Sequence, residues 1–184
     1  MEPNQLRCAA CNVSTGAWER FVSYMVKPEI TVTEGGSFDS VRKGISHLSK
    51  MRAYVGIPEK AASRPGEEVN NAELLYIHTN GSPLQNIPAR PVIEPAIEIS
   101  DNREMIEAEL AECADAELDG MVDAAIEHLI RAGTIGSNAA KRWFRDPRNG
   151  WPENAPSTIA KKGSDRPMID TGELRRNITH VEEY

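Results

Sequence analysis

The sequence predicts an α+β fold, in which a small antiparallel sheet packs against one long helix and several short helices, with extended loops and arms. The first observation is a run of apolar residues at helical spacing across 101–132. The second is a set of short β-branched or alternating segments, typical of strands, at 29–33, 52–57 and 178–181. The third is a content of 12 prolines and 13 glycines, which favours many breaks between short elements.

We expect one domain over 18–184, preceded by an N-terminal arm over 1–17. The chain of 184 residues, 40% of them hydrophobic, is long enough for one domain with a packed core. The arm is polar and carries Cys8 and Cys11 in a CxxC motif. Zinc needs about four ligands, and no second CxxC or paired-histidine motif follows, so we expect free thiols. A zinc or redox site on this cysteine pair is the alternative, which elemental analysis would test.

The first part of the domain is expected to contain two strands and a helix. Residues 18–26 are mixed apolar and fit either a helix or a strand, whereas 29–33, reading EITVT, alternates like a strand. Ser37 can cap a helix that runs to Leu48 with its apolar residues on one face. The next strand, 52–57, ends at a proline.

Two extended loops are expected next, on either side of a short helix. The first loop covers 58–70, and the helix covers 71–79 with an asparagine at its start. The second loop covers 80–100, where prolines at 88, 91 and 95 exclude a central strand and a continuous helix. This second loop is therefore expected to be extended and rigid.

The long helix is predicted over 101–132. Asp101 can cap its start, with Glu104 completing a capping box, and Gly133 is a typical residue for its end. Its length would exceed about 40 Å if it were unbroken, and Gly120 is the place where it can bend. The remaining expected elements are a helix at 138–145, a loop at 146–156, a short helix at 157–162, a helix at 170–176 capped by Asp170 or Thr171, and the strand at 178–181.

The charge distribution bears on the class of partner. A net charge of −7 argues against wrapping nucleic acid by bulk electrostatics. A basic cluster nevertheless follows the acidic middle of the chain, with Trp143 and Phe144 among its members. It could contact DNA phosphates or an acidic partner; the alternative is an amphipathic helix with packed aromatics and hydrated cations. The cluster consists of Lys141, Arg142, Arg145 and Arg148.

The sequence predicts no catalytic residues, no metal site and no cofactor. The four histidines, at 47, 78, 128 and 180, are scattered, and the chain has no HExxH, P-loop or GxSxG motif. The carboxylates of 101–132 could hold a metal, but a solvated helix face is more common. No apolar run is long enough to span a membrane, and the first residues lack the apolar core of a signal peptide, so we expect synthesis in the cytoplasm.

Two pairs of segments carry a family resemblance. The first pair is Tyr76–Gly81, reading YIHTNG, followed by Ile87–Pro95, reading IPARPVIEP. The second is Thr158–Gly163, reading TIAKKG, followed by Arg166–Arg175, reading RPMIDTGELR. In this order, on either side of a long helix, they resemble the head–tail joining and tail-completion (virion morphogenesis) proteins of tailed bacteriophages. The resemblance covers about 52–182 and departs from the family pattern at Val92, Met168 and Asn177, where Phe, Leu and Ser are usual.

The resemblance implies a structural virion protein without enzymatic activity. Such a subunit forms a homo-oligomeric ring, of six or twelve copies, in the neck or collar at the head–tail junction or at the completed tail. The ring joins the head connector or adaptor to the tail terminator or tail tube, and double-stranded DNA passes through it. The expected location is therefore the virion, with assembly in the host cytoplasm.

The two proline-containing segments are the expected contact surface with neighbouring subunits or partners. A segment made rigid by proline loses little entropy on docking. The alternative is that both segments only complete the fold within the chain. A second function, a small DNA-binding or regulatory protein that uses the helix 141–148, also stays open. The expected interface residues are Ile87, Pro88, Ala89, Arg90, Pro91, Pro95, Asp170, Thr171 and Gly172.

Overall fold

The computed structural model describes residues 39–184 and confirms the α+β class. The expected arm 1–17, the segment 18–26 and the expected strand 29–33 lie outside the described residues. The strands are β1 (Arg52–Gly56) and β2 (Thr179–Glu183), and η1 (Pro83–Gln85) and η2 (Pro147–Asn149) are short 3-10 helices. The α-helices are α1 (Asp39–Leu48), α2 (Glu59–Ala62), α3 (Asn71–Asn80), α4 (Ile93–Glu98), α5 (Ser100–Leu118), α6 (Val122–Trp143), α7 (Pro156–Lys162) and α8 (Glu173–Asn177).

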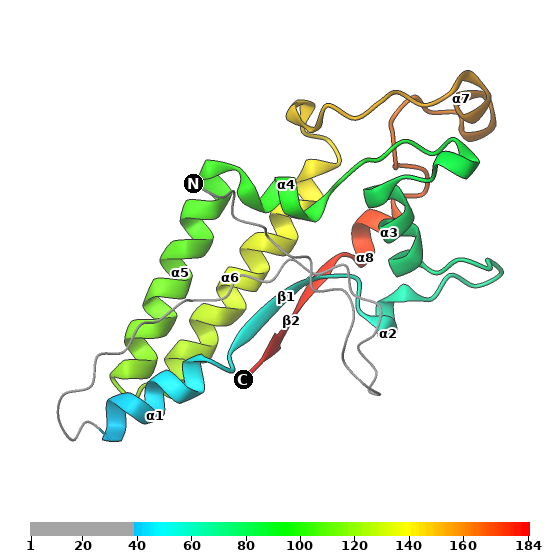
Figure 1. The fold of residues 1–184 in the computed structure, drawn as a ribbon. Helices are drawn as coiled ribbons and strands as arrows, with labels where there is room; N and C mark the ends of the chain where they lie inside the picture. Colours follow the sequence, from blue (N-terminus) through cyan, green and yellow to red (C-terminus); the bar gives the residue numbers. More distant parts are fainter. Residues whose placement is uncertain (1–38) are drawn as a thin grey trace.

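The prediction of one helix over 101–132 is wrong, because this part of the chain forms the hairpin of α5 and α6 (Figure 1). The chain reverses at Gly120, whose φ of 78° lies in the left-handed region. The backbone N–H of Met121 closes the turn by donating to the carbonyl of Ala116 at 2.8 Å. Glycine adopts this conformation without a steric penalty, so Gly120 reverses the chain instead of bending a helix.

The expected end of the long helix is also wrong. Gly133 lies inside α6, and the helix expected at 138–145 is the last part of α6. A Cβ atom on Gly133 would lie 3.0 Å from the ring of His180, and one on Gly136 would lie 2.9 Å from Cγ2 of Val55. Both glycines are therefore explained by the close approach of the sheet to α6 and not by a helix end.

The two strands form an antiparallel ladder that packs on α6. Val55 is the ladder partner of His180, so the two residues that contact the glycines of α6 stand opposite each other in the sheet. The ring nitrogens of His180 lie 3.2 Å from Ser137 Oγ and 3.3 Å from Thr134 Oγ1. The expected strands at 52–57 and 178–181 are confirmed, with β2 extending two residues further.

The core consists of two apolar clusters. The larger includes Ile57, Leu75, Val92 and Ile178, each at most 1% exposed, and joins the sheet to α3, α4, α6 and α8. The smaller includes Leu48, Cys113 and Leu129, and joins α1 to the hairpin of α5 and α6. The elements expected at 71–79 and 157–162 are present as α3 and α7, and Asn70 forms the capping box of α3 with Glu73.

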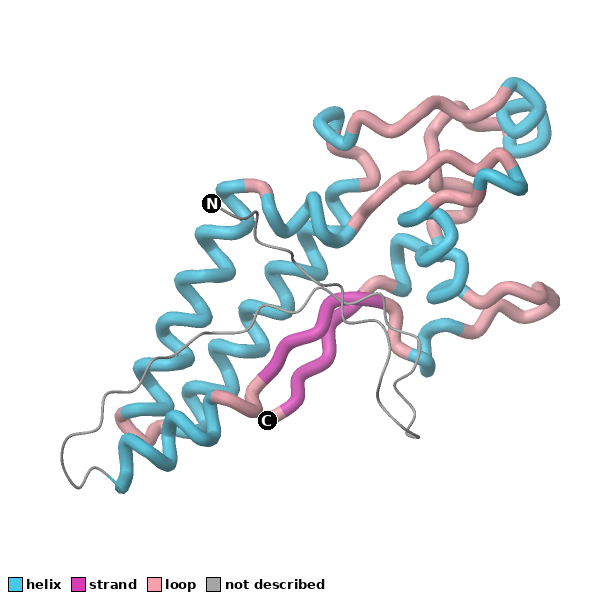
Figure 2. Tube along the Cα trace, viewed as in Figure 1, coloured by secondary structure: helices cyan, strands magenta, loops and turns pink. Residues whose placement is uncertain are grey.

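Both expected loops contain helical turns. Helix α2 forms within 58–70, and η1 and α4 form within 80–100, so neither segment is extended throughout. Pro95 lies in the first turn of α4, where an amide has no partner inside the helix and proline is tolerated. Helix α5 begins at Ser100 with Ile99 at the cap position, so the expected cap by Asp101 is not formed. Figure 2 shows that loops are concentrated away from the α5–α6 turn.

Candidate functional site

The segment Ile87–Pro91 is held against the end of α3. An antiparallel bridge pairs Ser82 with Ile87, with N···O distances of 2.8 and 2.9 Å. The backbone N–H of Arg90 donates to the carbonyl of His78 at 2.6 Å. Gly81 allows this approach, because a Cβ there would lie 2.8 Å from the backbone nitrogen of Ala89. The expected rigidity of this segment therefore has a structural cause in addition to its prolines.

The side chain of Arg90 is buried inside the chain. It is 6% exposed, and its Nε and Nη2 donate to the carbonyl of Pro152 at 3.2 and 2.8 Å. Nη2 also donates to the carbonyl of Glu153 at 3.1 Å, and burial lowers the pKa of the guanidinium. A planar guanidinium suits this fork of acceptors. For Arg90, the geometry therefore favours the alternative of a role within the fold.

The carbonyl of Pro91 accepts two indole N–H groups. Nε1 of Trp143 donates at 3.1 Å and Nε1 of Trp151 at 3.0 Å. The ring of Trp151 stands at 89° to that of Phe144, with centroids 5.7 Å apart. Trp143 and Phe144 are 6% and 4% exposed, so the aromatics of the basic cluster are packed. This carbonyl fastens the end of α6 and the following loop to the proline segment.

The second motif segment leads into α8. The expected helix 170–176 begins later, at Glu173, after Gly172 with a φ of 76°. Gly172 occupies the cap position and no side chain caps the helix, so the expected cap by Asp170 or Thr171 is not formed. Thr171 Oγ1 accepts from the N–H of Glu173 at 3.3 Å in the preceding turn. Glu173 in turn accepts from Nδ2 of Asn71 at 3.0 Å. This hydrogen bond ties α8 to the start of α3.

Lys162 lies near charged groups of both motif segments. Burial lowers the pKa of Lys162, the carboxylate of Asp170 opposes this shift, and Arg90 adds to it. Burial and the nearby charges of Arg90 and Lys162 lower the pKa of His78, whose Nδ1 is buried without a hydrogen-bond partner. The segments 76–95 and 158–175 therefore lie together, and we call this part the motif end. Figure 1 shows α7, in the motif end, far from the α5–α6 turn.

The expected interface residues differ in exposure. Arg90 is buried, whereas Ile87, Pro88, Pro95 and Gly172 are partly buried. The remaining four are exposed on the motif end, and we call them the motif surface: Ala89, Pro91, Asp170 and Thr171.

The four members of the basic cluster differ in exposure and in hydrogen-bond partners. Arg142 Nη2 donates to Asn102 Oδ1 at 3.1 Å. Arg148 makes a two-pronged contact with Asp146, at 2.9 and 2.7 Å, and lowers the pKa of that carboxyl to about 2. Lys141 is partly buried, and Arg145 is exposed beyond the end of α6. The cluster therefore has fewer cations available for a partner than its four members suggest, because Arg142 and Arg148 are hydrogen-bonded within the chain.

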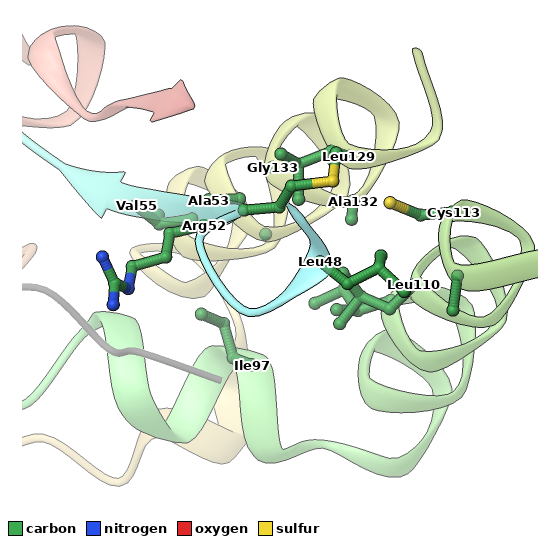
Figure 3. Close-up of a pocket in the computed structure, with 14 residues that line it drawn as sticks. Leu48, Arg52, Ala53, Val55, Ile97, Leu110, Cys113, Leu129, Ala132 and Gly133 are labelled. Atoms are coloured by element: carbon green, nitrogen blue, oxygen red, sulfur yellow. The ribbon is translucent and has the colours of Figure 1, made fainter. Parts of the chain in front are cut away.

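An apolar cavity of about 80 Å³ lies between β1, α5 and α6 (Figure 3). Its lining includes Val55, Leu110, Leu129 and Cys113, and burial and Glu117 raise the pKa of the Cys113 thiol. Arg52 lies at its edge, and in Figure 3 its guanidinium points away from Cys113. Apart from Arg52 at its edge and the Cys113 thiol, the lining of this cavity is apolar, so its chemistry is that of core packing.

Within 39–184, no group of three or more His, Cys, Asp or Glu side chains is placed to hold a metal ion. No helix in the same range is long and apolar enough to cross a membrane. The chain matches no family model, no curated protein and no solved structure in the comparisons made.

Sequence reasoning missed the residues that hold the motif end together. The acceptors for Arg90 are the carbonyls of Pro152 and Glu153, which carry no sequence signature. Trp151 could have been noticed, because an indole N–H beside a loop needs an acceptor. Lys162 belongs to the segment TIAKKG, but its proximity to the charges of Arg90 and Asp170 depends on the fold.

Proposed function

We propose that this protein is a structural subunit of a tailed-phage particle and forms a ring at the head–tail junction. In this role it joins the head connector to the tail and lets DNA pass. The main support is the motif end: the two segments that resemble the joining proteins lie together there, where α3 is in contact with α8. Exposed residues of both segments are held on a stiff framework, which suits a surface that docks on a partner.

The framework explains how one segment can serve both the fold and a partner. Arg90 and the Pro91 carbonyl are satisfied within the chain, so they fix the backbone that carries the motif surface. Ala89 and Pro91 are exposed side chains on that backbone. Because folding already orders this backbone, less conformational entropy is lost when a partner docks.

The test is a particle-assembly experiment in the phage that encodes the chain. Loss of the gene should leave filled heads and separate tails. Adding the purified protein to an extract of cells infected with the mutant phage should restore joined, infectious particles. Electron microscopy and infectivity provide the two measurements. Normally joined particles without the protein would contradict the proposal.

A surface variant makes this test residue-specific. Ala89→Glu combined with Thr171→Arg changes two exposed side chains of the motif surface, and we expect it to abolish complementation while the protein stays folded. The matched control is Lys60→Glu with Glu67→Lys, two exposed positions outside the motif end, which should complement normally. Equal complementation by both variants would exclude the motif surface as the contact.

DNA binding through the helix end at 141–148 is the second candidate function. The exposed guanidinium of Arg145 favours it, whereas the pairing of Arg148 with Asp146 weakens it. If DNA binding were the function, affinity would fall steeply with salt and Arg142→Glu with Arg145→Glu would abolish it. A failure of particle assembly in this variant, without DNA binding by the wild type, would exclude it.

A further inference from the structure

The α5–α6 turn carries an exposed apolar patch. Leu118, Met121 and Val122 are 40%, 53% and 40% exposed, and Val41 of the neighbouring α1 is 38% exposed. We call these four residues the helical tip. A Cβ on Gly44, one turn after Val41, would lie 3.6 Å from Cδ2 of Leu118, which places α1 directly beside the turn. The turn is held by a hydrogen bond from the Met121 N–H to the Ala116 carbonyl.

Negative charge borders this patch on the side of the α5–α6 turn, whereas Arg42, paired with Asp39 at 2.8 Å, and Lys43 are exposed beside Val41. Between Arg103 and Arg131 the sequence contains no lysine or arginine. Asp119 and Asp123 are exposed on either side of Met121. An apolar centre with a charged rim is the usual construction of a protein–protein interface. The carboxylates of this stretch are Glu104, Glu107, Glu109, Glu112, Asp115, Glu117, Asp119, Asp123 and Glu127.

Arg103 and Arg131 pair with Glu107 and Glu127, but local structure does not explain the carboxylates at the end of α5. The carboxyl end of a helix carries a partial negative charge, which disfavours acidic residues there. Helix α5 nevertheless ends with Asp115 and Glu117, followed by Asp119, and has no basic residue in its last turn. Glu117 Oε1 lies 2.9 Å from Nδ1 of His47, whereas Asp115 and Asp119 are exposed. An external cation would relieve this repulsion.

Cations lie at the other end of α6, and Arg145 and Arg176 are exposed there. Helix α6 has 22 residues, so its ends are about 33 Å apart. Its carboxyl end carries Lys141 and is followed by Arg145. Arg175 Nε donates to the Lys141 carbonyl at 2.7 Å, which fixes α8 and its exposed Arg176 beside this end. We call Lys141, Arg145 and Arg176 the basic end.

We propose that the helical tip of one copy docks on the basic end of α6 in the next copy, head to tail. The charges of the two surfaces are complementary, whereas two helical tips facing each other would place carboxylates against carboxylates. A contact between two different surfaces of identical chains is heterologous, and it produces a ring when the rotation closes. This inference rests on the proposed ring function and names its subunit interface.

The experiment uses two full-length variants that each keep one of the two surfaces. The tip variant carries Asp119→Lys and Asp123→Lys, and the basic-end variant carries Arg145→Glu and Arg176→Glu. A control, Glu67→Lys with Glu68→Lys, makes the same charge change as the tip variant in an exposed loop. Circular dichroism checks that all are folded, and sedimentation velocity measures association up to about 0.1 mM, where micromolar Kd values are detected.

The head-to-tail contact predicts a specific pattern. The wild type and the control form oligomers that weaken with salt, and each variant alone loses at least about a hundredfold in association constant, since like charges then face each other. An equimolar mixture of the two variants associates again, because the acidic tip of one meets the unchanged basic end of the other, and the two charge-reversed surfaces are also opposite in sign.

Three results would overturn the inference. The first is a wild type that stays monomeric over this concentration range. The second is a pair of variants that associate like the control. The third is a basic-end variant that still associates with itself, since its contact would then join two helical tips. None of them removes the ring function, which the loss of the gene tests separately. Conversely, normal particles without the protein would reject the ring function even if the head-to-tail contact exists in solution.

Discussion

Gly136 of α6 should not tolerate a methyl group. Its missing Cβ would lie 2.9 Å from Cγ2 of Val55, a distance that real Cβ atoms essentially never show. Val55 is 5% exposed in the core, so its side chain has little room to withdraw. Gly136→Ala must therefore push β1 away from α6 or force Val55 out of its rotamer.

The size of the effect follows from two opposing contributions. Replacing glycine by alanine inside a helix gains up to about 1 kcal/mol in helix propensity. Overpacking a well-packed core costs about 1–3 kcal/mol. We therefore expect a net loss of about 1–2 kcal/mol in the free energy of unfolding, which corresponds to a fall in Tm of about 3–6 °C for a domain of this size.

The assay is urea unfolding with a matched control and a compensating change. Asn138→Ala, at an exposed position two residues further along α6, reports helix propensity alone and should be neutral or slightly stabilising. Val55→Ala should cost less in the Gly136→Ala background than in the wild type, because the two changes share one contact. If Gly136→Ala stabilises the protein as much as Asn138→Ala does, the close approach of sheet and helix is wrong.

Three further predictions concern the motif end. Arg90→Gln should lower the free energy of unfolding by about 2–3 kcal/mol and accelerate hydrogen exchange in 150–155, because the carbonyls there lose their donor. Arg90→Lys should not restore protection from exchange, because lysine lacks the planar fork of donors. Unchanged exchange in both variants would contradict this prediction. Trp143→Phe should cost more in urea unfolding than Trp151→Phe, since Trp143 is the more deeply buried of the two indoles; equal costs would refute the difference. The lowered pKa of His78 means that the unfolded chain binds more protons between this pKa and 6.5, so stability should fall as pH decreases through that window. His78→Gln should flatten the pH dependence between about pH 7 and 5, and an unchanged slope would exclude His78 as its source.

Local patterns in the sequence were sufficient for several elements of the fold. The asparagine cap of the helix at 71–79 and the strand expected at 52–57 depend on neighbouring residues, and both are present, as Asn70 before α3 and as β1. The turn at Gly120 was missed as a reversal because Leu118 and Met121 continue the apolar spacing of α5 across it. The spacing continues because these residues form an exposed patch, which periodicity cannot distinguish from a buried stripe.

Long-range packing explains the other errors. Gly133 was expected to end a helix, since glycine is typical there, but its actual reason is the ring of His180 packing on it. That contact joins residues far apart in the chain, and no local pattern contains it. The same holds for Arg90, whose acceptors are backbone carbonyls in another loop. In the candidate site, the motifs could be found from the sequence, but the partners that hold them could not.

The two interpretations of the motif segments are compatible. A segment whose polar groups are satisfied inside the chain is fixed in one conformation, and a fixed surface loses less entropy when a partner docks. The contacts of Arg90 and of the Pro91 carbonyl supply this fixation, while Ala89 and Pro91 keep exposed side chains. If the motif surface docks as we propose, Arg90→Gln should weaken assembly without altering any exposed side chain. A partner-binding defect in this variant, with native helix content, would therefore separate preorganisation from direct contact.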